Sequence, residues 1–127
     1  SLDFDNNSSS EVFDIMNIDD CYQGMDAGPN TLKSFKKVIL KSKTILWNGP
    51  VGVFEFSNFS KGTKELGKYI SESTDKGAFS LVGGGDSVAA VKAFGIQNNM
   101  SYVSTGGGAM LESLEGKTLP GINALLS

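Results

Sequence analysis

The chain has 127 residues, a formal net charge of −3 and 39% apolar residues, which fits one compact soluble domain with a modest core. The negative charge argues against a surface that binds nucleic acid mainly by neutralising phosphates, and no apolar run reaches the ~20 residues of a membrane helix. The sequence contains no histidine, and all 11 basic residues are lysine. A Ser-His-Asp triad, a histidine-ligated zinc site and a bidentate arginine clamp for phosphate are therefore excluded within this chain.

The remaining composition points to chemistry by backbone amides, carboxylates and lysines. Glycine is abundant: 16 of the 127 residues are glycine, roughly 13%, whereas about 7% is usual. The single cysteine, Cys21, excludes an internal disulfide and fits a reducing compartment. Because no histidine can activate it, we expect Cys21 to be a small buried or surface residue and not a nucleophile. Because the chain begins with Ser1 and not with methionine, we expect it to be a piece of a longer protein.

Residues 1–23 have the weakest pattern. Leu2 and Phe4 alternate with aspartates, which predicts a short strand. Residues 6–10 are asparagines and serines, a composition typical of a polar loop. We therefore expect an uncertain strand followed by a loop before the regular part of the domain begins.

From residue 30 onward, apolar spacing predicts alternating helices and strands. A first helix is expected to begin with Asn30 or Thr31 as its cap, and a later one with Asp86 or Ser87 as its cap. The other predicted elements are strands at residues 45–47, 79–82 and 102–103 and helices at residues 58–74, 109–114 and 122–126.

Strands that alternate with helices over short links are typical of βαβ units. We therefore predict an α/β fold, a partial Rossmann-like three-layer α/β/α domain with a parallel sheet. Ligands of such sheets bind at the carboxyl ends of the strands. Three glycine-rich stretches follow the predicted strands, at residues 48–55, 83–87 and 104–108.

Residues 83–87 combine three glycines with an acid and a hydroxyl at the start of a predicted helix. Helix amino ends carry unpaired N–H groups and a partial positive charge, and glycines let an anion approach them closely. Asp86 is a carboxylate suited to Mg²⁺, and Ser87 can contact a phosphate oxygen. The alternative is that Asp86 only caps the helix while the glycines only turn the chain.

The other two stretches allow similar pairs of interpretations. Residues 106–108 open another helix after another strand, so two positive helix ends would face one anion, unless these glycines are only flexible turns. In residues 47–55, Val51, Val53 and Phe54 would form an apolar wall for a flat base, and Glu55 would accept hydrogen bonds from a ribose diol. Alternatively, Val53 and Phe54 belong to the core and Glu55 is a solvated loop charge.

Taken together, in this order and spacing, these motifs closely resemble the phosphoglycerate kinase family. The resemblance runs from about Gly24 to the end and rests on residues 24–29, 47–55, 83–87, 104–112 and 119–121. In that family two α/β domains face each other across a cleft, and the carboxy-terminal domain holds MgATP or MgADP. The resemblance implies that residues 1–127 are the C-terminal portion of this nucleotide-binding domain, incomplete, with residues 1–23 not placed.

The resemblance also implies individual roles. Glu55 would bind the ribose hydroxyls, and Asp86 would hold Mg²⁺. Gly85 and Gly108 are the predicted catalytic positions: the Gly85 amide would meet the phosphates, and Gly108 would open the helix that faces the transferred phosphoryl group. The nucleotide-binding residues implied by the resemblance are Gly24, Met25, Asn48, Gly49, Pro50, Val51, Gly52, Val53, Phe54, Glu55, Gly84, Gly85, Asp86 and Ser87.

The reaction implied is the reversible transfer of a phosphoryl group between 1,3-bisphosphoglycerate and ADP, giving 3-phosphoglycerate and ATP in glycolysis, with Mg²⁺ as cofactor. The basic patch for 3-phosphoglycerate would lie in the missing N-terminal domain, so we expect the isolated 127 residues to be inactive. The resemblance implies a cytoplasmic, monomeric full-length enzyme without nucleic-acid or membrane partners. Two alternatives stay open: a non-catalytic nucleotide- or anion-binding α/β module, and a structural half-domain that needs the rest of its chain to fold.

Overall fold

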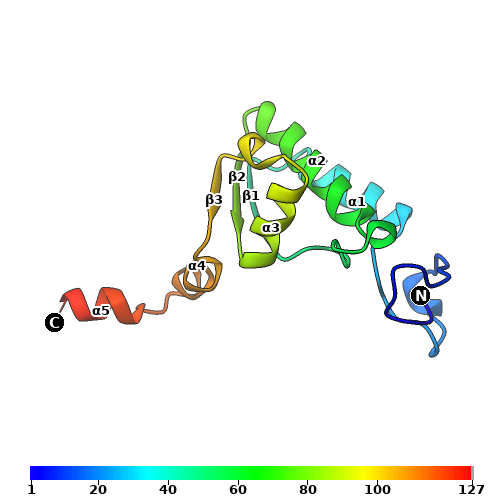
Figure 1. Cartoon of the computed structure of the whole chain (residues 1–127). Coiled ribbons are helices and arrows are strands. Elements are labelled where there is room, and N and C mark those ends of the chain that lie inside the picture. Colours follow the sequence, from blue (N-terminus) through cyan, green and yellow to red (C-terminus); the bar gives the residue numbers. More distant parts are fainter. Residues whose placement is uncertain (127) are drawn as a thin grey trace.

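The computed structural model describes residues 1–126, which form a small parallel sheet with helices packed against it (Figure 1). The sheet order is β1-β2-β3, and both pairs of neighbouring strands are parallel. The predicted α/β class is therefore confirmed. In chain order the elements are η1 (Ile15–Asn17), α1 (Pro29–Ile39), β1 (Thr44–Asn48), η2 (Ser57–Phe59), α2 (Lys61–Asp75), β2 (Phe79–Gly83), α3 (Gly85–Ala93), η3 (Gln97–Asn99), β3 (Tyr102–Ser104), α4 (Gly107–Leu114) and α5 (Pro120–Leu126).

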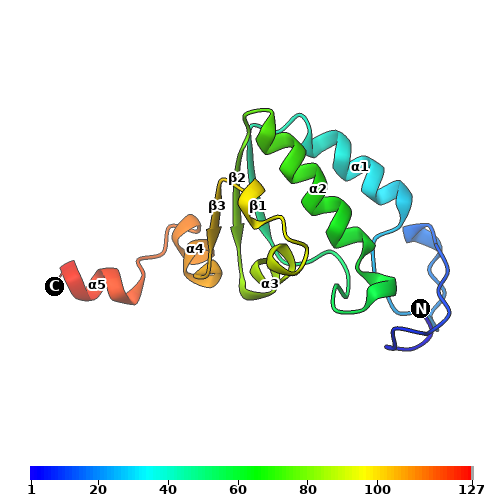
Figure 2. The same cartoon turned by 45° about the horizontal axis from the view of Figure 1, so that its top comes forward.

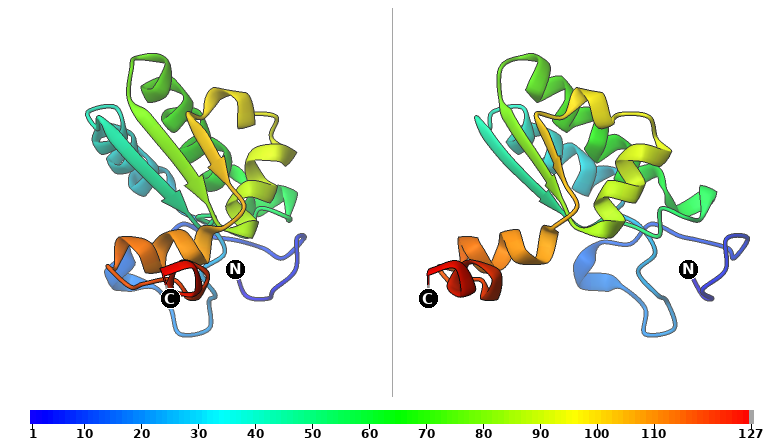
Figure 3. Two further views of the ribbon diagram at one scale, coloured as in Figure 1. Left: turned by 90° about the vertical axis from the view of Figure 1, so that its left-hand side faces the viewer. Right: turned by 60° about the vertical axis from the view of Figure 1, so that its left-hand side comes forward.

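The hydrophobic core lies on one face of the sheet. Trp47, Val82 and Val103 are register partners across the three strands, so their side chains point to this face. Ile70 of α2 and Val91 of α3 pack against them and are almost fully buried. Figures 2 and 3 show α2 and α3 on the same side of the sheet, with α1 alongside α2. Burial of this face fixes which way each strand faces.

The opposite face of the sheet is open. Leu46, Phe79 and Tyr102 point to it and are 42%, 51% and 60% exposed. Helix α4 contacts this face at the carboxyl end of β2, where Met110 meets Gly83. This arrangement agrees with the partial three-layer domain predicted from the sequence.

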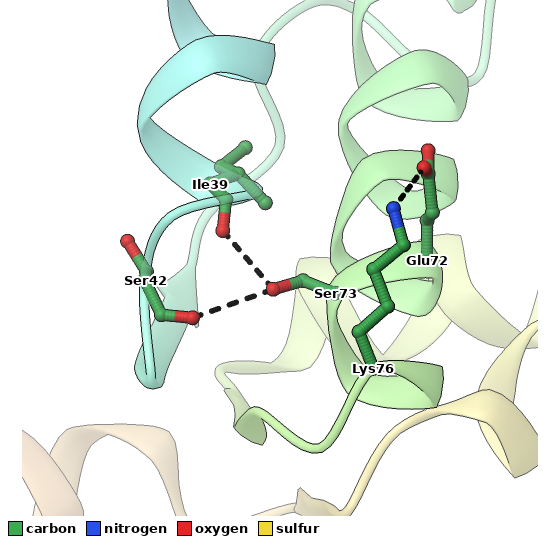
Figure 4. Close-up of polar contacts among 5 residues, drawn as sticks. All are labelled: Ile39, Ser42, Glu72, Ser73 and Lys76. Carbon is green, nitrogen blue, oxygen red and sulfur yellow. Dashed lines mark hydrogen bonds and ion pairs between the residues drawn. The ribbon is translucent and has the colours of Figure 1, made fainter.

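A buried serine joins the ends of α1 and α2 (Figure 4). The Ser73 hydroxyl lies 3.0 Å from the carbonyl oxygen of Ile39 and 3.4 Å from that of Ser42, and it can donate to either. Nearby on the surface, Lys76 donates to Glu72 across one helical turn at 2.7 Å, and this hydrogen bond lowers the pKa of the Glu72 carboxyl. Ser73 is 2% exposed and joins the two helices, so its contacts contribute more to stability than the exposed ion pair at the end of α2 does.

The predicted strand around Leu2 and Phe4 is wrong. The backbone there forms bends and turns, and Phe4 packs its ring on Phe56 with centroids 5.1 Å apart. Asn6 accepts a hydrogen bond from the Asn58 amide at 3.0 Å, which holds this segment beside η2. A strand needs a hydrogen-bonded neighbour, and in the described residues this segment pairs with no strand edge.

Both predicted helix caps are also wrong. Helix α1 begins at Pro29, because proline suits the first helical position, where its missing N–H costs nothing. Helix α3 begins at Gly85. The residue before it, Gly84, has a φ of 90°, which glycine adopts easily and other residues rarely do. Asp86 and Ser87 therefore lie inside the first turn of α3. Among residues 1–126, no helix combines the length and apolarity needed to cross a membrane.

Candidate functional site

The parallel register brings the three glycine-rich stretches to one edge of the sheet. Asn48 pairs with Gly83, and Gly83 pairs with Ser104, so all three strands finish level with one another. Residues 49–56, Gly84 and residues 105–106 therefore leave the sheet side by side. Figure 3 shows the three strands running in the same direction. The sequence prediction that these stretches share one edge is confirmed, and this is the ligand-binding edge of parallel α/β sheets.

The amino ends of α3 and α4 touch through their backbones. A Cβ atom built on Gly107 would collide with the nitrogen and Cα of Gly84 and would lie 2.9 Å from the carbonyl carbon of Gly83. Gly107 is buried, whereas Gly85 and Gly108 are exposed, and nothing lies within 4 Å of a Cβ built on either of them. Two adjacent helix amino ends present N–H groups and positive partial charge together, which suits a phosphate chain.

Asp86 is exposed to solvent in the first turn of α3. Across residues 1–126, no three acidic, cysteine or histidine side chains gather closely enough to hold a metal ion. Mg²⁺ typically takes one or two carboxylates and completes its shell with waters and substrate phosphates. A single exposed carboxylate beside two helix amino ends fits that pattern.

Ser87 has a different environment. Its side chain is fully buried, and its hydroxyl accepts a hydrogen bond of 2.6 Å from the Gly49 N–H. This bond ties residues 49–55, called here the nucleotide loop after the role that the sequence predicts for them, to the start of α3. The contact between Ser87 and a phosphate stays a prediction.

Three further contacts hold the nucleotide loop. The indole N–H of Trp47, a core residue, donates to the carbonyl of Gly49 at 2.7 Å. The Val53 N–H donates to the carbonyl of Met25 at 2.9 Å. The buried Thr63 hydroxyl accepts from the backbone of Val51 at 3.2 Å. The loop is therefore ordered by hydrogen bonds to residues from four different segments.

The nucleotide loop keeps its apolar side chains outside the core. Val53 and Phe54 are half-buried and do not belong to the core cluster, so the alternative that made them core residues is wrong. The Phe54 ring meets Phe94 edge-on, with centroids 6.3 Å apart, and Glu55 is exposed beside it. An exposed carboxylate next to half-buried apolar side chains is chemically suited to a ribose next to a base.

The remaining predicted positions lie around this loop. Met25 is 4% exposed, and Gly24 beside it is exposed. Asn48 is exposed, and its side-chain oxygen lies where a Cβ on Gly84 would be. Pro50 is half-buried in the loop. The structure thus brings the predicted nucleotide-binding residues into one neighbourhood.

A cavity of about 570 Å³ lies between residues 10–29 and helices α1 and α2. Of the predicted nucleotide-binding residues, only Gly24 and Met25 line it. Tyr69 is another lining residue, and its pKa is raised by a hydrogen bond with Glu65 and by burial. The cavity therefore borders the strand-end loops beside residues 24–26.

Sequence reasoning missed two side chains that organise the site, Asp26 and Thr63. Asp26 accepts a hydrogen bond of 2.8 Å from the Gly62 N–H at the start of α2. Thr63 is fully buried within the same helical turn. Asp26 directly follows Gly24 and Met25, which the sequence analysis singled out, so its position could have drawn attention to it. No feature of the sequence marks Thr63.

Comparison with known proteins decides the family. A family model described as Phosphoglycerate kinase matches residues 1–117. The chain belongs to the phosphoglycerate kinase family. It is 62% identical over 122 residues to the phosphoglycerate kinase of Porphyromonas gingivalis, covering 96% of this chain and 29% of that protein. It is 51% identical to that of Thermosynechococcus vestitus, covering 96% of this chain and 30% of the relative.

Solved phosphoglycerate kinase structures share the fold. The structure from Coxiella burnetii superposes with a TM-score of 0.83 at 43% identity, covering 91% of this chain and 29% of that one. The crystal structure from Pyrococcus horikoshii superposes with a TM-score of 0.72 at 43% identity, covering 83% of this chain and 25% of that one. The chain thus spans less than a third of the length of these phosphoglycerate kinases.

Proposed function

We propose that this chain is the C-terminal part of the nucleotide-binding domain of a phosphoglycerate kinase. That enzyme would transfer a phosphoryl group reversibly between 1,3-bisphosphoglycerate and ADP, giving 3-phosphoglycerate and ATP. The observation that carries the proposal is the contact between the amino ends of α3 and α4 at the edge where the nucleotide loop also leaves the sheet. A helix-end pair beside an apolar loop suits the two halves of a nucleotide, its phosphates and its base.

The proposed roles follow from position. Met25 and Val53, joined by a backbone hydrogen bond, would support the adenine, and the exposed Glu55 would accept hydrogen bonds from the ribose. Gly85 and Gly108 would present backbone N–H groups to the phosphates from the two touching helix ends. Phosphoryl transfer depends mainly on positioning and electrostatic stabilisation, so backbone amides are sufficient for this half of the site.

Asp86 would hold Mg²⁺ together with the phosphates. When bound, the ion would neutralise charge on the phosphate oxygens. Asp86 is exposed at the amino end of α3, so its carboxylate is open to a cation from solvent. The Asp86 carboxylate would fix the position of the nucleotide relative to the backbone amides of α3.

A site that binds 3-phosphoglycerate would be supplied from outside these 127 residues, because the chain has no arginine or histidine for it. We therefore propose that the isolated chain is inactive and that turnover needs the rest of the enzyme. The glycolytic role, the cytoplasmic location and the monomeric state of the full protein stay predictions from the family.

The test uses a chimera in which this chain replaces the matching 122 residues of the Porphyromonas gingivalis relative. We expect turnover of 3-phosphoglycerate with MgATP in the chimera and none with the chain alone. In calorimetric titrations, Asp86→Ala should weaken binding of MgADP at least tenfold and leave binding of metal-free ADP within about twofold. Asp75→Ala, at the far end of α2, is the matched control and should change neither.

The outcomes separate the alternatives. A folded chimera that binds nucleotide without turnover would support a non-catalytic binding module. A chimera that binds neither ADP nor MgADP contradicts the proposed function. Far-UV dichroism and a thermal melt of the chain alone address the half-domain alternative, since a cooperative melt shows that residues 1–127 fold without the remainder.

A further inference from the structure

We propose that Asp26 is a positioning residue that holds the nucleotide loop, residues 49–55, against Met25 and the amino end of α2. Its carboxylate lies at the junction of three segments, at residues 24–28, 49–53 and 60–63. This inference rests on the proposed function, because the consequence we expect is a change in nucleotide affinity. Asp26 itself is not proposed to touch the nucleotide.

Both oxygens of the Asp26 carboxylate are engaged. One accepts a hydrogen bond of 2.8 Å from the Gly62 N–H, and the other accepts one of 2.8 Å from the Ala27 N–H. Gly62 is the second residue of α2, and Ser60, at the cap position, makes no side-chain cap bond. Asp26 therefore caps α2 from a segment 36 positions earlier, where its negative charge also complements the helix dipole.

Two glycines leave room for this carboxylate. A Cβ built on Gly52 would collide with the carboxylate and would lie 2.7 Å from its carbon. A Cβ built on Gly62 would also collide with it, at 3.0 Å from the same carbon. The nucleotide loop and the start of α2 thus approach Asp26 from two sides, and any side chain at either glycine would displace the carboxylate.

The same junction carries the proposed adenine contacts. Met25, directly before Asp26, receives the Val53 N–H at 2.9 Å. Thr63, directly after Gly62, receives the backbone N–H groups of Val51 and Gly52 at 3.2 and 3.4 Å. Moving Asp26 would therefore shift Met25 and the nucleotide loop relative to each other. If the loop then held its binding arrangement a tenth of the time, the apparent dissociation constant would rise tenfold.

Asp26→Asn in the chimera is the first test. The Gly62 and Ala27 N–H groups bond to different carboxylate oxygens, and the amide replaces one of these oxygens with an NH₂ group, so one N–H would face a donor instead of an acceptor. We expect the KM for MgATP to rise about tenfold, equivalent to about 1.4 kcal/mol. The KM for 3-phosphoglycerate and the kcat should stay within about twofold. Asp75→Asn, an exposed acid at the other end of α2, should leave all three values unchanged.

Gly62→Ala separates positioning from stability. Alanine favours a helix over glycine, which offsets part of the cap that α2 loses when the carboxylate moves, so we expect α2 to stay folded in this variant. We expect it to raise the KM for MgATP as Asp26→Asn does, because its methyl group displaces the carboxylate while the helix stays folded. Gly121→Ala, a helical glycine with open space around it, is the matched control and should leave the KM unchanged.

Each outcome decides a different point. If the KM for MgATP is unchanged in both variants while the parent chimera turns over, Asp26 is not a positioning residue and the proposed function stands. If kcat and both KM values worsen together with loss of helical dichroism in both variants, the role is structural only and the inference is overturned. If the parent chimera binds no nucleotide, the proposed function falls, and the inference with it.

Discussion

Gly107 and Gly108 are neighbours at the start of α4, yet the structure predicts opposite responses to alanine. A Cβ on Gly107 would overlap the nitrogen and Cα of Gly84, and at 2.9 Å it would also crowd the Gly83 carbonyl carbon. All three are backbone atoms, so no side chain can rotate away, and α3 and α4 would have to separate. At Gly108 nothing lies within 4 Å of an added Cβ.

The magnitudes follow from these surroundings. Overpacking against a rigid neighbour typically costs 1–3 kcal/mol, and we expect Gly107→Ala to lose roughly that much free energy of unfolding. Gly108→Ala should gain up to about 1 kcal/mol, because alanine is the better helix former. In the chimera, Gly108→Ala should nevertheless lower kcat by about tenfold or more, since its methyl group would stand where we propose that the phosphoryl group is held.

Urea unfolding, followed by the fluorescence of Trp47, the chain's single tryptophan, measures the difference in free energy of unfolding between the two variants. Turnover of the chimera measures the change in kcat of Gly108→Ala. Trp47 is 4% exposed and close to the site, so it reports loss of the packed state. Equal stabilities for the two variants would refute the backbone contact between α3 and α4. Full activity in Gly108→Ala would refute the proposed catalytic position of Gly108.

Two further predictions concern the carboxyl end of α2. Ser73→Ala should lower the free energy of unfolding by about 1–2 kcal/mol, because it removes a buried donor shared by two carbonyl groups, and urea titration of the chain measures this loss. Glu72→Gln should lower the melting temperature slightly at pH 7 and not at pH 3. The pKa of Glu72 is lowered in the folded state from its ordinary value of 4.5. The ionised carboxylate therefore stabilises the fold at pH values above 4.5, and this stabilisation disappears as the pH falls through the lowered pKa of the folded state. An equal effect of Glu72→Gln at both pH values would contradict the ion pair with Lys76.

Most of the fold could be predicted because its elements are encoded locally. The apolar runs of residues 45–47, 79–82 and 102–103 each became the centre of a parallel strand, and the links between them became helices. The predictions that were wrong concern details that local patterns do not decide. Leu2 and Phe4 alternate like a strand but pair with no strand within residues 1–126, and a helix can also begin at a proline or after a glycine without a capping side chain.

The candidate site divides in the same way. The glycine-rich stretches could be placed at one edge, because the carboxyl ends of parallel strands meet there. The contacts that shape the nucleotide loop could not be predicted, because they join residues far apart in the chain. Ser87 meets Gly49 across 38 positions, and Asp26 meets Gly62 across 36. Such pairs depend on how helices pack, which no local spacing records.

The sequence by itself determined that this chain lacks histidine and arginine, that three glycine-rich stretches follow apolar strands, and that any chemistry would rely on backbone amides, carboxylates and lysines. Composition and short-range periodicity suffice for such conclusions. Only the tertiary structure decided that Gly107 touches the backbone of Gly84, that Ser87 is buried against the nucleotide loop, and that Asp26 joins this loop to α2. The physical reason is that close approach of distant backbones is a property of packing, whereas a helix or a strand is a property of neighbours in the chain.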